Sequence, residues 1–133
     1  MTNSGRFDGA APMPARCLGL TTMHVEPGSV AISGRVDPEY DDDPECIHSL
    51  TSATLDVALD RAVRSTLDES HASAVIELTV RYARSFNSAN GNLICRASVT
   101  QLSEHLGTAS AHIVDADENR FVEADATCMI RRI

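Results

Sequence analysis

The chain contains no lysine and few aromatic residues, and these absences narrow its chemistry. All 11 basic residues are arginine. Schiff-base catalysis and a lysine nucleophile are therefore excluded. With a formal net charge of −8 and 4% aromatic residues, the chain also lacks the basic surface that holds a nucleic-acid backbone. We expect no nucleic-acid partner.

Long apolar runs and paired cysteines are missing too. No hydrophobic run approaches the roughly 20 residues that span a bilayer, so no membrane partner is expected. The first residues lack the organisation of a secretory signal, which favours a cytoplasmic location. The four cysteines have neither zinc-site nor disulfide-scaffold spacing, and we expect buried or idle thiols. They are Cys17, Cys46, Cys95 and Cys128.

Acidic residues concentrate in one short stretch. Such a run can bind a hard cation, but it is more often a solvated loop, and we predict a loop without a metal ion. Its members are Asp37, Glu39, Asp41, Asp42, Asp43 and Glu45.

The first half of the chain predicts two strands and one long helix. Residues 1–14 read as a flexible arm ahead of a single domain over residues 15–133. Strand-compatible segments at 17–25 and 29–36 flank a turn, which predicts a hairpin. Apolar residues then recur at helical spacing, without Gly or Pro, over residues 49–67. They are Leu55, Ala58, Leu59, Ala62 and Val63.

The second half predicts four antiparallel strands. From Ala74 the period changes to two, so that Ile76, Leu78, Val80 and Tyr82 share one face. Three further strands are predicted at 92–102, 106–114 and 120–130. The order β-β-α-β-β-β-β indicates an α+β fold with one helix on an antiparallel sheet. Because such a sheet has open edges, we expect a homodimer or a dimer of dimers.

This order resembles the phenylacetate-degradation type of hotdog-fold thioesterase. Two segments carry the likeness best, Leu55-Asp56-Val57-Ala58-Leu59 on the helix and Val75-Ile76-Glu77-Leu78-Thr79-Val80-Arg81-Tyr82 on the next strand. The stretch from Asn90-Gly91-Asn92-Leu93 through Val114-Asp115-Ala116-Asp117 follows the same strand-turn pattern. The resemblance runs from about Cys17 to Ile130 and implies a sheet wrapped around one long helix.

The resemblance also implies a site at the helix. In that family a His-Gly-Gly motif opens the helix, and an acidic residue two turns later activates water or attacks the thioester. Asp56 matches the acid, whereas Ile47, His48 and Ser49 stand where the motif would be. His48 coincides with the family histidine only if one residue has been lost between it and Asp56.

Thioester hydrolysis needs a base or nucleophile and donors for the oxyanion. Asp56 lies at the rim of the apolar stripe, whereas Asp60 is expected nearer solvent, paired with Arg64. Backbone N–H groups of a first helical turn near His48 and Ser49 are the expected oxyanion donors.

Three functions stay open. The first is an acyl-CoA thioesterase that needs no cofactor, coenzyme A being part of its substrate, with a site shared between two chains. Arg84 stands where related proteins often carry an arginine, and the resemblance makes it the candidate for a CoA phosphate contact. The favoured alternative is a solvated arginine at a strand end. The alternatives are a hotdog dehydratase or hydratase using His48 and Asp56, and a non-catalytic binder of acyl thioesters.

Overall fold

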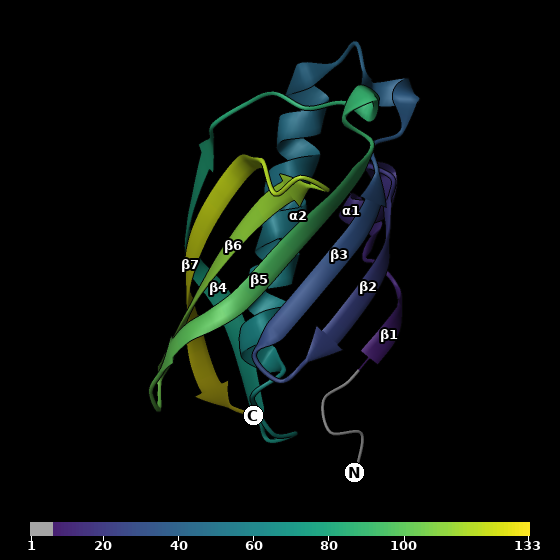
Figure 1. Cartoon of the computed structure of the whole chain (residues 1–133). Coiled ribbons are helices and arrows are strands. Elements are labelled where there is room, and N and C mark those ends of the chain that lie inside the picture. Colours follow the sequence, from purple (N-terminus) through teal and green to yellow (C-terminus); the bar gives the residue numbers. More distant parts are fainter. Residues whose placement is uncertain (1–6) are drawn as a thin grey trace.

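The computed structural model describes residues 7–133, in which an antiparallel sheet curves around one long helix (Figure 1). The helical segments are α1 Met13–Cys17, η1 Pro38–Tyr40, α2 Pro44–Arg64 and η2 Ser88–Asn90. The strands are β1 Phe7–Ala10, β2 Leu20–Glu26, β3 Ser29–Arg35, β4 His71–Tyr82, β5 Asn92–Leu102, β6 Leu106–Asp115 and β7 Arg120–Arg132. The predicted order β-β-α-β-β-β-β is confirmed over β2 to β7, and β1 and α1 precede it.

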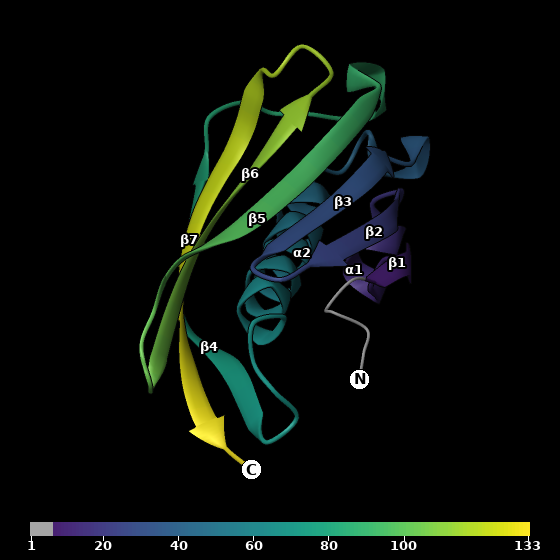
Figure 2. The ribbon, with the colours of Figure 1, turned by 60° about the horizontal axis from the view of Figure 1, so that its bottom comes forward.

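The strand order in the seven-stranded sheet is β1-β2-β3-β5-β6-β7-β4, so β1 and β4 form its two edges. Every neighbouring pair is antiparallel. The chain leaves β4 at one edge of the sheet and passes the N-terminal end of α2 before it enters β5 in the middle of the sheet (Figures 1 and 2).

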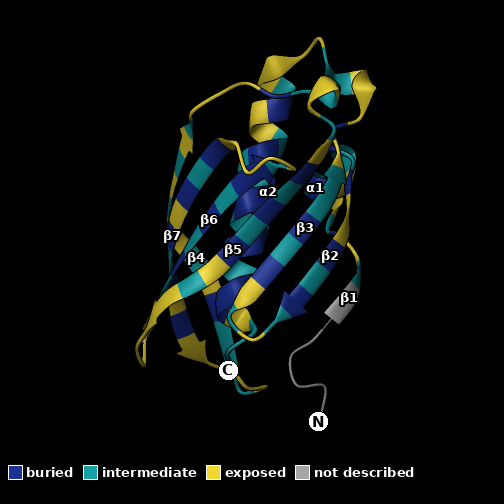
Figure 3. Cartoon of the chain, viewed as in Figure 1, coloured by how far each residue is buried: buried dark blue, intermediate teal, exposed yellow. Residues whose placement is uncertain are grey.

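The core lies between the inner face of the sheet and the apolar stripe of α2 (Figure 3). Leu55 and Leu59 are fully buried, as are Ala58, Ala62 and Val63. Burying a side chain such as Leu contributes about 1.5–3 kcal/mol relative to leaving it exposed. Among the described helices, none has the length and apolar character needed to cross a membrane.

Helix α2 begins five residues earlier than the apolar spacing predicts. Asp43 caps it, because its Oδ1 accepts the Cys46 N–H at 3.1 Å, and Pro44 occupies the first helical position. An acidic cap followed by proline is a common helix start, since proline's missing N–H is not needed there. Part of the acidic run is therefore helix and caps rather than a solvated loop.

The cap gives the first prediction. Asp43→Ala should lower the free energy of unfolding by about 1 kcal/mol, because the Cys46 N–H loses its acceptor. Chemical denaturation followed by circular dichroism measures this. Asp42→Ala is the matched control, since it removes the same charge from an exposed neighbour that caps nothing. Equal losses in the two variants would attribute the effect to charge rather than to the cap.

Regular secondary structure is present before residue 15, where the predicted domain begins. Residues 7–10 pair with β2, and Pro12 and Pro14 lie at the N-terminal end of α1, so the prediction of a flexible arm is wrong for residues 7–14. Strand β1 has four residues, which are too few to show the two-residue alternation of a strand, so the sequence does not predict it. The prediction for residues 1–6 lies outside the described part of the chain.

Gly19 turns the chain from α1 into β2 with a positive φ of 86°. A Cβ at this position would lie 1.9 Å from the Arg35 carbonyl oxygen, so glycine is required there.

A β-bulge changes the faces of β4. The register with β7 shifts between Val75 and Glu77, so Ile76 is extra and 57% exposed. Leu78, Val80 and Tyr82 pack against the core as expected, but the prediction that Ile76 shares their face is wrong. A bulge inserts one residue and reverses the alternation beyond it.

Candidate active site

Asp56 lines a hollow of about 420 Å³ between α2 and the edge strand β4. Its side chain is half-buried, and within residues 7–133 no hydrogen bond or ion pair holds its carboxylate. Burial raises the pKa of Asp56 above its ordinary value, and the Asp60 carboxylate raises it further. A half-buried carboxylate with a raised pKa is suited to act as a base or a nucleophile.

Asp60 lines the same hollow but is held in place. Its predicted ion pair with Arg64 is confirmed, with Nη2 and Oδ2 2.9 Å apart. The Asp60 side chain is 20% exposed, and its Oδ1 accepts a hydrogen bond from Ser73 Oγ at 2.7 Å. Strand β4 covers this side of the helix, which helical spacing alone cannot show. We call Asp60, Arg64 and Ser73 the Asp60 clasp.

His48 is held by stacking on Tyr82. The two ring centroids are 4.1 Å apart with 22° between the planes. The Tyr82 hydroxyl donates to the His48 carbonyl at 2.9 Å and shares a 2.7 Å hydrogen bond with Ser52 Oγ. Among the described residues, none hydrogen-bonds to the ring nitrogens of His48. The imidazole is therefore oriented while both nitrogens remain available to a ligand.

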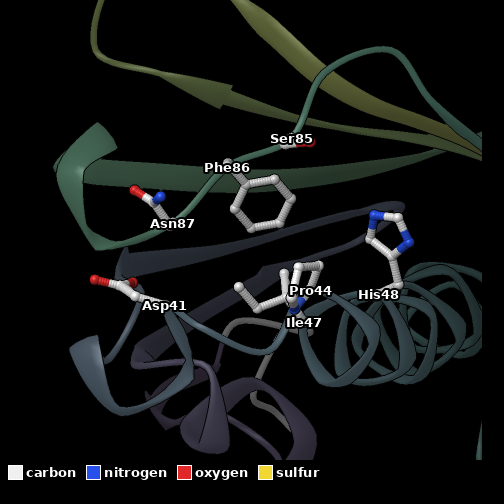
Figure 4. Close-up of a pocket in the computed structure, with 7 residues that line it drawn as sticks. All are labelled: Asp41, Pro44, Ile47, His48, Ser85, Phe86 and Asn87. Carbon is white, nitrogen blue, oxygen red and sulfur yellow. The ribbon is translucent and has the colours of Figure 1, made fainter.

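A small pocket of about 90 Å³ lies beside His48, between the start of α2 and the segment after β4 (Figure 4). Two of its polar side chains are already used, since Asp41 accepts hydrogen bonds from the backbone and side chain of Ser88, and Asn87 Oδ1 accepts from the Ala89 N–H. Besides the His48 imidazole, the pocket offers an apolar surface. That surface comes from Pro44, Ile47 and Phe86.

The start of α2 does not supply the expected oxyanion donors. Pro44 has no N–H, and the N–H groups of Cys46 and Ile47 donate to the side chain and carbonyl of Asp43. His48 and Ser49 follow in the next turn, where the helix's own carbonyls accept the backbone N–H groups. The prediction of first-turn backbone donors near these residues is therefore wrong. Side chains are left as the candidate donors.

Ser49 and Arg84 lie at the same end of the molecule as His48. Ser49 is exposed on α2 beside His48. Arg84 is exposed two residues after β4, and its guanidinium lies 6.0 Å from the centroid of the Phe121 ring. Along α2, Asp56 is about 12 Å from His48, at 1.5 Å per residue. Within a single chain, the Asp56 carboxylate therefore lies far along the helix from His48.

The described residues offer no group of three or more His, Cys, Asp or Glu side chains that could hold a metal ion. The acidic run is divided among other tasks, with Asp37 and Asp43 capping helical segments and Asp41 binding Ser88.

Solved structures match the chain, although neither a protein-family model nor a curated protein sequence does. The Escherichia coli PaaI protein of the phenylacetic acid degradation operon is 18% identical, with a TM-score of 0.72, covering 90% of this chain and 83% of its own. Thioesterase HI1161 of Haemophilus influenzae is 13% identical, with a TM-score of 0.72, and the match covers 89% of this chain and 82% of that protein. The Bacillus halodurans protein BH2602, solved with CoA, is 14% identical, with a TM-score of 0.65, and the match covers 77% of this chain and 66% of that protein. The chain has the hotdog fold.

The hotdog architecture predicted from the order of elements is confirmed. In this hotdog sheet, α2 is the wrapped helix and β4 is the longer of the two edge strands. Asp56 lies in the hollow beside that edge.

Sequence reasoning missed the residues that support the candidates. Tyr82 was expected on the inner face of its strand, but nothing in the sequence indicated that it would stack on His48. Ser73 and Phe86 lie outside any recognisable motif. Ser73 contacts Asp60, and Phe86 contacts Phe121, each more than ten positions away in the sequence. The alternation along β4 is the one sequence signal that indicates the face on which Tyr82 lies. The positions of Ser73 and Phe86 depend on tertiary packing, which leaves no such signal.

Proposed function

We propose that this hotdog protein hydrolyses acyl-CoA thioesters to a free acid and CoA, with Asp56 as the catalytic carboxylate. The observation that carries the proposal is the half-buried, unpaired Asp56 in the hollow beside β4. The neighbours described as thioesterases support this reaction, and the CoA bound to BH2602 supports a CoA thioester as the substrate.

In the proposed reaction, the ionised Asp56 accepts a proton from water while the water oxygen attacks the thioester carbonyl carbon. The C–S bond then breaks, and the leaving thiolate takes the proton from Asp56. Alternatively, the carboxylate attacks the carbonyl carbon directly, the C–S bond breaks and an anhydride forms as the CoA thiolate leaves. Water then hydrolyses the anhydride, which releases the free acid and restores Asp56, and the thiolate takes the proton set free. The His48 imidazole or the Ser49 hydroxyl donates to the oxyanion, and one such donor is typically worth about 2.7–4 kcal/mol in the transition state.

A complete site needs two chains in this proposal. Asp56 lies about 12 Å along the helix from His48, which is too far for both to contact one carbonyl. Pairing of the free β4 edges of two copies would let Asp56 of one chain face His48 and Ser49 of the other. We therefore propose a homodimer, with a dimer of dimers as a further possibility for assembly.

The CoA moiety would be held by arginine. Arg84 is exposed and forms no salt bridge within the described chain, and its charge helps to lower the pKa of Asp115. Its exposed guanidinium would bind a phosphate group. A cytoplasmic location, and the absence of nucleic-acid and membrane partners, stay predictions.

A non-catalytic acyl-thioester binder is the second candidate. One observation favours it: at the start of α2, Pro44 has no N–H, and the N–H groups of Cys46 and Ile47 already donate to Asp43, so these groups cannot stabilise an oxyanion. A binder needs no such donors, because it does not stabilise a transition state.

Release of free thiol from a panel of acyl-CoA esters separates the two functions. We expect the chain to hydrolyse at least one ester at a kcat of about 1 s⁻¹ or faster, a rate typical of enzymes. Calorimetry with a CoA thioether, which cannot be hydrolysed, measures binding in parallel. Binding without thiol release from any ester would contradict the thioesterase proposal and support the binder.

A further inference from the structure

The Asp60 clasp lies one helical turn from the proposed catalytic carboxylate and has no assigned task. Asp60 accepts a hydrogen bond from Ser73 Oγ at 2.7 Å and pairs with Arg64 at 2.9 Å. Arg64 also donates to the Ser73 carbonyl at 3.2 Å. Ser73 is only 7% exposed, so these bonds join α2 to β4 at the wall of the hollow.

We propose that Asp60 is a positioning residue for Asp56: the clasp fixes a second carboxylate beside it and so sets the pH at which Asp56 is ionised. This inference rests on the proposed function, in which Asp56 is the catalytic carboxylate. Asp60 itself does not touch the reacting atoms.

Geometry supports this role. Side chains four residues apart on a helix are neighbours, with Cβ atoms about 5–6 Å apart. A carboxylate fixed on the neighbouring helical turn disfavours a second negative charge, so it favours the protonated form of its neighbour. Because Ser73 and Arg64 hold both oxygens of Asp60, it cannot turn away from Asp56 to relieve the repulsion.

The other groups around the hollow are consistent with this assignment. On α2, Arg61 and Arg64 carry positive charge, and only Arg64 is bound to Asp60. Burial raises the pKa of Cys128 on β7 to about 11, so this thiol is neutral at physiological pH. The lining residues from β4 are uncharged and are Ser73, Ala74 and Val75. Asp60 is therefore the only other anionic residue among the described residues that line the hollow.

Two substitutions in the full-length chain test the inference. Asp60→Asn keeps the size of the side chain but removes its charge, so the pKa of Asp56 should fall. Arg64→Gln leaves Asp60 charged without its cation, so the pKa of Asp56 should rise. The acid limb of the kcat/KM profile should move in these opposite directions, and NMR titration of the ¹³C-labelled Asp56 carboxyl should move with it.

A purely structural clasp would behave differently. Both substitutions would then loosen the same wall and admit water, and both would lower the pKa of Asp56. Shifts in the same direction, or no shift, overturn the inference. Asp125→Asn is the matched control and should shift nothing, because Asp125 has the same partners, a serine at 2.7 Å and an arginine at 2.9 Å, on the outer face of the sheet.

The NMR titration needs no substrate, so the two proposals can fail separately. Opposite shifts in a chain that hydrolyses no thioester would support the coupling of Asp60 to Asp56 and contradict the proposed function. Hydrolysis that depends on Asp56 but shows equal titration in all variants would support the function and overturn this inference.

Discussion

Asp56→Asn should lower the turnover of the best acyl-CoA substrate by about two to four orders of magnitude. The amide keeps the size of the side chain but can neither accept a proton from water nor attack a carbonyl. Stability should change little, since within residues 7–133 nothing is hydrogen-bonded to the Asp56 carboxylate. Steady-state thiol release and chemical denaturation measure the two effects.

The pH profile adds a second readout for the same residue. Only the ionised carboxylate acts as base or nucleophile, so activity should be lost as pH falls through the pKa of Asp56. Because burial and Asp60 raise that pKa, the acid limb should lie above the pH of about 4 at which an ordinary aspartate titrates. Asp125→Asn is the control, and it should change neither the turnover rate nor the pH at which the acid limb lies. Undiminished turnover in Asp56→Asn would remove Asp56 from the mechanism.

Ile76→Glu should dissociate the proposed dimer and abolish most of its activity. Ile76 is 57% exposed at the bulge of the free edge strand, so a single chain should tolerate the change within about 0.5 kcal/mol. Two-fold pairing of β4 strands would instead bring the new carboxylates close to each other and to Glu77. We expect dimer affinity to fall at least about 100-fold, because like charges across an interface cost several kcal/mol.

Sedimentation velocity and thiol release, measured at the same concentrations, check this result. Leu102→Glu is the matched control, an exposed leucine at the end of β5, and it should leave both assembly and rate unchanged. Activity should follow the dimer fraction as concentration is raised. A monomeric variant with full activity would show that one chain holds a complete site.

The predictable part of the fold is the part with regular spacing. The stripe from Leu55 to Val63 and the alternation from Leu78 to Tyr82 reflect burial on one face, which is visible in sequence at periods of 3.6 and 2. The helix start at Pro44 was missed because apolar spacing begins only later. Its Asp-Pro signal was read as part of an acidic loop. The bulge at Ile76 leaves no sequence pattern of its own.

The candidate site was predictable only where one residue carries the chemistry. Asp56 could be selected from its place on the helix and from the family resemblance. Its surroundings could not, because Ser73 reaches Asp60 from a different element, and Tyr82 reaches His48 likewise. Contacts between elements depend on packing that local spacing does not encode.

The two edges of the sheet differ in a way that bears on polymerisation. An edge strand is a template for further strands, and a sheet with two long open edges can extend into a fibre. Here β4 offers twelve residues, whereas β1 offers only four and is followed closely by Pro12 and Pro14. Once two copies pair through β4, the outermost strands left are the short β1 segments. Growth of the sheet should therefore stop at the pair, which protects a chain with an exposed edge from aggregation.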